Sequence, residues 1–244
     1  MHLDAPQLEL SGTTLNAAGS LGFVPRKGDT PPGLAAFTTN PISLQPRRPS
    51  HGERMLAFPG GVLLHTGLPN PGLRRCIQDY GMAWAHAEMP IILNLLIDSP
   101  ADLRKVVPNI EALDNLAALE LNIPADASPQ LAADLCAAAL GKLPVLAQLT
   151  LPRAEELAGA CLRAGASAVS LGAPRGSLLG PDGKVVNGRL YGPAIYPQAL
   201  AATQALTRAG VPVIAAGGIE SEAQAAACLA AGAMAVQWDV ALWK

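Results

Sequence analysis

Short apolar segments alternate with helical patterns along most of the chain. Eight segments of four or five residues are predicted to form buried strands: Leu15–Ala18, Ala36–Thr39, Ile91–Leu95, Ala118–Asn122, Val145–Leu149, Ala168–Leu171, Val213–Ala216 and Ala235–Trp238. Their apolar residues run almost without interruption, which is typical of parallel strands covered on both faces. Eight strands alternating with helices is the number that closes a (β/α)₈ barrel. The pattern therefore predicts an α/β fold, with one TIM-barrel domain over residues 1–244.

The helices between these strands carry start and stop signals. One is predicted over 129–140, with Ser128 as its N-cap and Pro129 in its first turn. Others are predicted over 152–165 and 220–231, each ending at or next to a glycine. Pro108 interrupts a further helical segment, which we expect to be short, kinked or divided.

Two connections are long, His51 to Gly72 and Ala173 to Tyr191. Both follow the end of a predicted strand, and barrel proteins build their sites at the C-terminal ends of strands. Loops of this length are usually functional or mobile. Arg175 and Lys184 lie in the second connection, where they could cover the barrel mouth and attract an anion, or be ordinary solvated charges.

Composition narrows the choice of partners. The net charge is −2 and only 15% of residues are charged, so neither nucleic acid nor an anionic membrane is expected as a partner. No apolar run reaches the roughly 18 residues of a spanning helix and no leader pattern is evident, which favours a cytoplasmic protein. The four cysteines show no paired spacing and are expected to be buried thiols, and no metal site is expected.

Seven segments carry short motifs in a fixed order. They are Asn16–Gly19, Phe37–Arg47, Gly60–Val62 with Gly67–Gly72, Pro90–Asn94, Glu120–Ile123, Gly192–Pro197 and Val211–Gln237. Together they resemble the dihydroorotate dehydrogenase family, which are FMN-dependent β/α barrels of pyrimidine synthesis. Each segment alone is a weak match, whereas seven in family order are specific. The resemblance covers nearly the whole chain and implies a barrel of this type, FMN at the C-terminal mouth and, as in many family members, a homodimer.

The resemblance also assigns residues to the site. It implies flavin contacts at Ala18, Gly19, Asn40, Asn122, Gln148, Gly192, Gly217 and Gly218, and substrate contacts at His65 and Asn70. The backbone amides of the two glycines Gly217 and Gly218 could hold a phosphate, or the pair could simply form a tight turn. The asparagines could instead hold loop backbone, Gln148 could fill the barrel interior, and His65 could be an ordinary loop residue.

The chain departs from the family pattern where the chemistry takes place. Six positions differ: Leu64 stands for a substrate-binding Asn, Asn40 and Gln148 for lysines beside the flavin, Ala125 for the catalytic Cys or Ser, Gly172-Ala173 for an Asn-Thr pair, and Asp239-Val240 for a phosphate-binding Gly-Thr. Ala125 cannot accept a proton, and losing a positioned base costs roughly 10²–10⁴-fold in rate. No catalytic residue is therefore assigned. Asp126 is a weak substitute, because a loop carboxylate is a poor base unless it is buried.

The charge of Asp239 affects whether FMN can bind. A carboxylate about 4 Å from a phosphate costs roughly 1–4 kcal/mol for each pair of unit charges. We therefore expect weak or absent FMN binding. If FMN did bind, Asp239 would have to turn outward and leave the amides of Gly217 and Gly218 to the phosphate.

Three classes of function follow. The prediction is a degenerate barrel that does not oxidise dihydroorotate and that binds a small-molecule or phosphate-bearing ligand at its C-terminal face, or serves as a scaffold. One alternative is an active FMN-dependent dihydroorotate oxidoreductase. The other is a flavin or phosphate-ligand enzyme that acts on another substrate.

Overall fold

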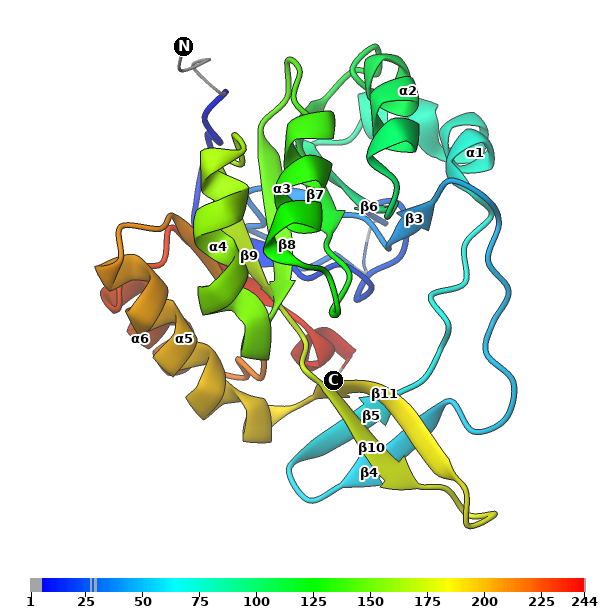
Figure 1. Ribbon diagram of the computed structural model, residues 1–244, viewed down its shortest axis with the longest axis vertical. Helices are drawn as coiled ribbons and strands as arrows, with labels where there is room; N and C mark the ends of the chain where they lie inside the picture. The colour runs from blue at the N-terminus through cyan, green and yellow to red at the C-terminus, as the bar shows by residue number, and fades with distance from the viewer. Residues whose placement is uncertain (1–5, 27, 29, 244) are drawn as a thin grey trace.

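Parallel strands surrounded by helices form the core of the computed structural model, which describes residues 6–26, 28 and 30–243 (Figure 1). The barrel strands are β1 (Thr14–Asn16), β2 (Phe37–Thr38), β6 (Ile91–Leu96), β7 (Leu116–Asn122), β8 (Val145–Thr150), β9 (Ala168–Gly172), β12 (Val213–Ala216) and β13 (Ala235–Trp238). They pair in the order β1-β13-β12-β9-β8-β7-β6-β2, and every pairing is parallel. A parallel bridge between Leu15 and Ala36 joins β1 to β2. The eight strands thus form a nearly closed barrel, which confirms the predicted fold.

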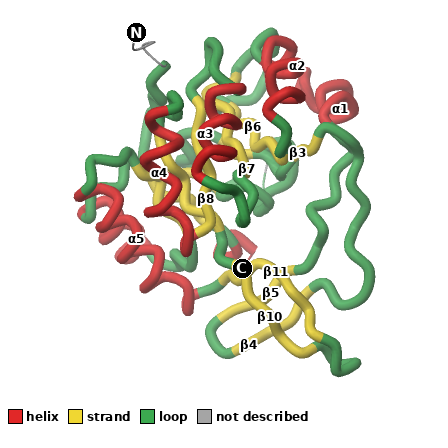
Figure 2. Tube along the Cα trace, viewed as in Figure 1, coloured by secondary structure: helices red, strands yellow, loops and turns green. Residues whose placement is uncertain are grey.

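Helices cover the outside of the barrel (Figure 2). They are α1 (Leu73–Ala85), α2 (Pro100–Ile110), α3 (Pro129–Ala138), α4 (Ala154–Arg163), α5 (Tyr196–Arg208) and α6 (Glu222–Ala230). Ser128 caps α3 as predicted, because its side chain accepts a hydrogen bond from the Leu131 amide. The helix predicted from 152 begins two residues later, since Pro152 lies in the short 3₁₀ helix η1 (Leu151–Arg153). Pro108 is accommodated in the last turn of α2.

Side chains that point into the barrel form an apolar layer beneath a polar one. The apolar layer contains Leu15, Ala36, Ile92, Ala118, Leu146, Ala168, Ile214 and Ala235. Two residues farther along six of the strands, where the strand period returns the side chain to the same face, the residues are Thr38, Asn94, Glu120, Gln148, Ser170 and Gln237. The polar layer is therefore the floor of the barrel mouth.

Glu120 lies at the centre of this polar layer and is fully buried. Its carboxylate accepts hydrogen bonds from Asn94 Nδ2 at 2.7 Å, from Gln237 Nε2 at 3.0 Å and from Gln148 Nε2 at 3.5 Å. Gln148 thus binds inside the barrel, which agrees with the alternative that this side chain fills the interior rather than contacting a flavin.

All four cysteines are free and buried as predicted. Burial raises the pKa of Cys76, which lies outside the barrel, to about 12.

A second sheet lies over the mouth of the barrel. The strands β4 (Met55–Phe58), β5 (Gly61–Leu64), β10 (Arg175–Leu179) and β11 (Val185–Tyr191) pair antiparallel in the order β10-β11-β5-β4. The short strand β3 (Ile42–Ser43) instead extends the barrel by pairing with the end of β6. The sequence predicted long connections here without strands, and that part of the prediction is wrong. The two connections pair with each other across more than a hundred residues of sequence, and this pairing forms a second layer beside the barrel mouth (Figure 1).

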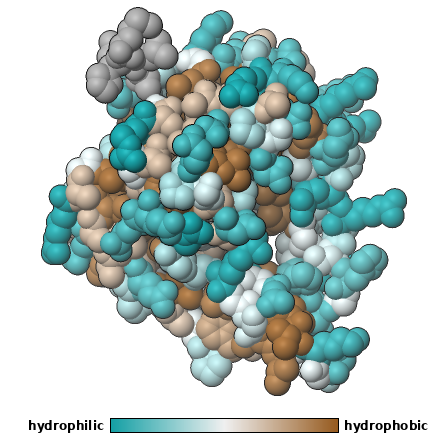
Figure 3. All heavy atoms as spheres, viewed as in Figure 1, coloured by the Kyte–Doolittle hydropathy of each residue, from teal (hydrophilic) through white to brown (hydrophobic). Residues whose placement is uncertain are grey.

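Hydrophobic side chains gather at the lower edge of the molecule, over this antiparallel sheet (Figure 3). Met55, Leu179 and Val185 are each more than half exposed there. Among the helices that the structure describes, none is long and apolar enough to span a membrane.

Candidate functional site

Three adjoining cavities occupy the space between the strand ends of the barrel and the antiparallel sheet. The outer cavity, of 450 Å³, is lined by Ala18, Gly19, His65, Arg175 and Arg189 among others. The central cavity lies directly over the strand ends and measures 40 Å³. The lateral cavity, of 570 Å³, reaches the loops after β6 and β7. All three are lined by Arg189, which places this side chain at the middle of the mouth.

Two side chains of β11, Arg189 and Tyr191, line the central cavity above the strands. Arg189 Nη2 donates to Asn122 Oδ1 at 3.2 Å, and Tyr191 lines the same cavity. Burial raises the pKa of the Tyr191 phenol, the nearby Arg189 lowers it, and Asp239 raises it further. A volume of 40 Å³ holds a few water molecules, whereas pockets for organic ligands measure roughly 300–1,000 Å³.

Asp239 follows β13 and turns inward. Its side chain is 5% exposed, and Oδ2 accepts a hydrogen bond from the backbone amide of Gly218 at 3.2 Å. Burial raises the pKa of the carboxyl, and the amides of Gly218, Val240 and Ala241 act in the opposite direction. The last two amides belong to the short 3₁₀ helix η3 (Val240–Trp243). The Asp239 carboxylate therefore accepts the hydrogen bond of an amide that the sequence analysis considered for a phosphate, and it does not have the outward orientation that was expected if FMN were bound.

The glycines of the mouth are required by close backbone approach. Gly218 has φ +68°, and a Cβ there would collide with the Gly192 carbonyl oxygen and lie 2.7 Å from the Tyr196 amide nitrogen. Gly192 has φ +111°, and a Cβ would lie 2.6 Å from the Gly61 Cα. Gly217 also has a positive φ, of +113°. These contacts explain the glycines without any ligand, so they favour the tight-turn alternative.

Two of the predicted asparagines hold loop backbone. Asn70 is buried, and its Oδ1 accepts hydrogen bonds from the amides of Ser43 and Gly72 while its Nδ2 donates to the Leu68 carbonyl. Asn40 Oδ1 accepts from the Gly22 amide at 3.1 Å. Neither residue lines the three cavities, in contrast to His65, Ala18 and Gly19, which line the outer one. The substrate role of Asn70 and the flavin role of Asn40 therefore gain no support.

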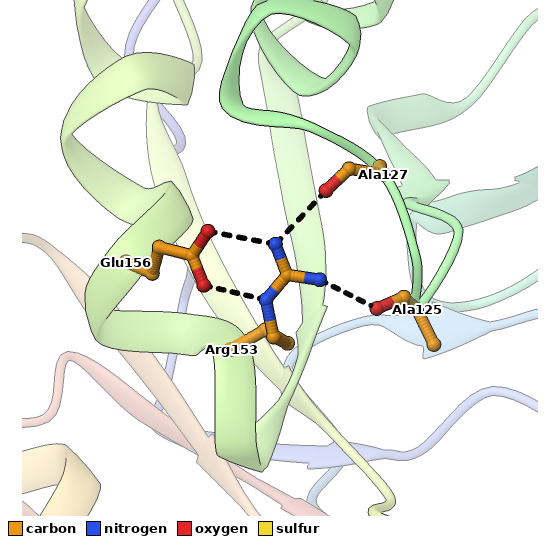
Figure 4. Close-up of polar contacts among 4 residues, drawn as sticks. All are labelled: Ala125, Ala127, Arg153 and Glu156. Atoms are coloured by element: carbon orange, nitrogen blue, oxygen red, sulfur yellow. Dashed lines mark hydrogen bonds and ion pairs between the residues drawn. The ribbon is translucent and has the colours of Figure 1, made fainter.

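The loop after β7, where the family resemblance implies a catalytic base, is fixed by Arg153 (Figure 4). Arg153 donates through Nη1 to the Ala125 carbonyl at 2.9 Å and through Nη2 to the Ala127 carbonyl at 3.0 Å. Glu156 binds the same guanidinium at 2.6 and 2.8 Å, and Arg153 lowers the pKa of the Glu156 carboxyl. Asp126 is exposed on this loop, within electrostatic reach of Arg153. The loop lines the lateral cavity but presents only a methyl group at position 125.

Sequence reasoning missed Arg189 and Tyr191 as site residues. Both lie on β11, immediately before the Gly192-Pro193 motif, in a segment that was predicted as a loop. The sequence of β11, VVNGRLY, does not alternate apolar and polar residues strictly, so it carries no clear local signal of a strand. In the part of the chain that the structure describes, no three His, Cys, Asp or Glu side chains are grouped so as to hold a metal ion.

The chain is similar to curated proteins over almost its whole length. It is 30% identical over 264 residues to the catalytic subunit of dihydroorotate dehydrogenase B (NAD(+)) of Pelobacter propionicus, covering 97% of this chain and 86% of that protein. The chain belongs to the dihydroorotate dehydrogenase family. The corresponding subunit of Trichlorobacter lovleyi is 32% identical over 265 residues, with 97% and 86% covered.

The fold of this dihydroorotate dehydrogenase family member also agrees with a solved structure. The crystal structure of dihydroorotate dehydrogenase from Eimeria tenella in complex with ferulenol superimposes with a TM-score of 0.72 at 15% identity, covering 100% of this chain and 81% of the other. No family model matches the chain.

Proposed function

We propose that this family member is a ligand-binding barrel that does not keep FMN as a resident cofactor and does not oxidise dihydroorotate. The observation that carries the proposal is the inward Asp239 carboxylate on the Gly218 amide. A phosphate in the same place would lose that amide and face a buried negative charge. The residues of the mouth therefore do not fit the phosphate of FMN.

Space above the strands supports the same conclusion. A flavin ring placed in the central cavity, directly over the strand ends, would have to displace the Arg189 and Tyr191 side chains, since that cavity has only 40 Å³. Moving Arg189 would also break its hydrogen bond to Asn122. Both side chains come from β11, so the displacement would extend to the antiparallel sheet.

The position of the base supports the absence of catalysis. Ala125 has no group that accepts a proton, and Asp126, the substitute considered from the sequence, is exposed to solvent. The Ala125 and Ala127 carbonyls, on either side of Asp126, are tied to Arg153, so this loop is held in place. A missing base alone costs roughly 10²–10⁴-fold in rate.

A steady-state assay tests the proposal directly. The purified chain is supplied with FMN, dihydroorotate and an artificial electron acceptor, beside the variant Ala125→Cys. We expect turnover from neither protein, because restoring the base leaves Asp239, Arg189 and Tyr191 in place. Clear turnover by the unmodified chain would overturn the proposal, and the variant Asp126→Asn would then show whether Asp126 is the base.

An FMN-dependent oxidoreductase, acting on dihydroorotate or another small substrate, is the second candidate. It is favoured by family membership and by the backbone amide of Gly218, which already binds an anionic group. It requires Asp239 to rotate outward. A cytoplasmic location and a homodimer stay predictions.

A further inference from the structure

We propose that the outer cavity binds a small organic dianion between Arg175 and Arg189. The inference takes from the proposed function only that the mouth binds a ligand, and it names the chemical class of that ligand. It rests on the charge, register and surroundings of these two arginines.

Arg175 and Arg189 lie directly opposite each other in the antiparallel pair of β10 and β11. Residues in that relation point to the same face of the sheet, with Cβ atoms roughly 4.5–5.5 Å apart. Both side chains line the outer cavity. Like charges placed directly opposite on one face are destabilising, and an anion between the two guanidinium groups would remove that repulsion.

The structure gives these arginines no carboxylate partner. Ion pairs among the described residues join Arg75 to Asp79, Lys105 to Asp102, Arg153 to Glu156 and Lys184 to Asp182. The Arg189 guanidinium donates to the neutral Asn122 side chain. A third arginine of the same cavity, Arg47, donates to the Gly67 carbonyl.

The wall of the outer cavity carries three arginines, Arg47, Arg175 and Arg189, against one acidic side chain. Asp239 is the one acidic side chain that lines the outer cavity, and its carboxylate already accepts from Gly218. His65 lines the cavity as well, and adds positive charge when it is protonated. Asp98, Asp102 and Asp126 line the adjoining lateral cavity, which reaches the loops after β6 and β7. Arg175 and Arg189 line that cavity too, but neither forms an ion pair among the described residues.

The dimensions and walls of the cavity define the ligand further. Its volume of 450 Å³ lies in the roughly 300–1,000 Å³ range of pockets for small molecules. Leu64, Leu68 and Trp243 supply an apolar wall. Guanidinium forks match carboxylate and phosphate oxygens in pairs. A dicarboxylate or a phosphate ester with a small apolar part satisfies both features.

Binding of malonate and of inorganic phosphate, in a buffer free of other multivalent anions, tests the inference. Calorimetric titration measures each affinity against chloride at equal ionic strength, and the malonate and phosphate arms distinguish the two kinds of anion. We expect at least one of them to bind, and Arg175→Leu to weaken it by about tenfold or more, as for loss of a charge-assisted hydrogen bond. Arg208→Leu, on the exposed end of α5, is the matched control and should leave the affinity unchanged.

The melting temperature of the variant Arg175→Glu, with and without anion, distinguishes an anion-binding arginine from one with a structural role alone. It replaces the repulsion across β10 and β11 by an attraction, so we expect a higher melting temperature than the parent without added anion, and no further rise with anion. Arg208→Glu controls for net charge. Equal affinity of Arg175→Leu and parent, or no anion binding beyond the effect of chloride, would overturn the inference.

Flavin absorbance of the same preparations separates this inference from the proposed function. Anion binding by a preparation that also carries flavin would support the arginine site and refute the absence of a resident FMN. A flavin-free preparation that binds neither anion would support the absence of a resident FMN and refute the arginine site.

Discussion

The Asp239 carboxyl stands where the family resemblance implies a phosphate-binding glycine, and it is buried against Gly218. Sequence comparison identified the changed position and its charge, because both follow from residue type. The direction of the side chain could not be predicted. It depends on the amide of Gly218, twenty-one residues earlier, and on the turn into η3.

Asp239 also predicts a dependence of stability on pH. Burial raises its folded-state pKa above the ordinary value of 3.8, so its contribution to stability is fully present below pH 3.8 and is lost as the pH rises through the folded pKa. A tenfold change in an acid dissociation constant corresponds to about 1.4 kcal/mol. Asp239→Asn should therefore gain stability relative to the parent as the pH rises from about 4 to 7.

Urea denaturation at several pH values measures this difference. Asp114→Asn is the control, because Asp114 is an exposed carboxyl on the turn before β7. A difference between Asp239→Asn and parent that stays constant with pH, as expected for the control, would show that the Asp239 carboxyl is not destabilised by burial.

At the scale of single elements, the barrel strands were predictable and the antiparallel sheet was not. A strand such as Ile91–Leu96 is buried on both faces and therefore reads as a continuous apolar run. β10 and β11 contain Gly176, Gly188 and several polar residues, and β11 pairs with β5, a strand more than a hundred residues away. No local pattern encodes such a pairing, so the segments resembled loops.

The loop after β7 depends on one side chain of η1. We predict that Arg153→Ala frees the Ala125 and Ala127 carbonyls and speeds amide hydrogen exchange over residues 124–128. It should also lower the free energy of unfolding more than Arg75→Ala does, since the Arg75–Asp79 pair is an isolated surface ion pair on α1. Equal effects of the two substitutions would mean that the carbonyl contacts contribute nothing measurable.

The turn after β12 depends on Gly218. Gly218→Ala should lower the free energy of unfolding by about 2 kcal/mol or more, because the new Cβ meets two backbone groups at a positive φ. Gly183→Ala is the control for the free-energy cost of a positive φ alone, since Gly183 has φ +76° and a Cβ added there would meet no atoms within 4 Å. Thermal and urea denaturation compare the two variants. A loss for Gly218→Ala no greater than that for Gly183→Ala would contradict the close approach of the turn to Gly192.

At the scale of the whole molecule, closure of the barrel depends on Asn16. β1 and β2 share a single backbone bridge, and the fully buried Asn16 side chain adds two hydrogen bonds across the same seam, to the Thr38 carbonyl at 2.7 Å and from the Thr38 amide at 2.8 Å. We predict that Asn16→Ala costs about 1–3 kcal/mol, because it leaves buried backbone groups unpaired.

Urea denaturation gives the free energy for this variant, and hydrogen exchange at Thr38 shows whether the seam opens. Asn109→Ala, on the exposed face of α2, serves as the control. Unchanged protection of the Thr38 amide in Asn16→Ala would show that the strands hold the barrel closed without this side chain.

The mouth of the molecule shows where sequence-based prediction stops. The changed positions Ala125, Gln148 and Asp239 were identified from the sequence alone. The positions of Arg189 and Tyr191 over the strand ends could not be identified in this way, because they depend on the pairing of β11 with β5 in the second sheet. Whole-molecule packing, which no single segment specifies, thus decides how much space the mouth retains.

Titration with FMN tests the central claim, that Asp239 occupies the place of the flavin phosphate. The unmodified chain should show no flavin absorbance as purified, and Asp239→Gly should bind FMN at least about tenfold more tightly than the unmodified chain does, since one buried like-charge contact is removed. Asp239→Asn, which removes the charge but keeps the side chain, should fall between them. One tightly bound FMN per unmodified chain, with no gain in Asp239→Gly, would contradict the account.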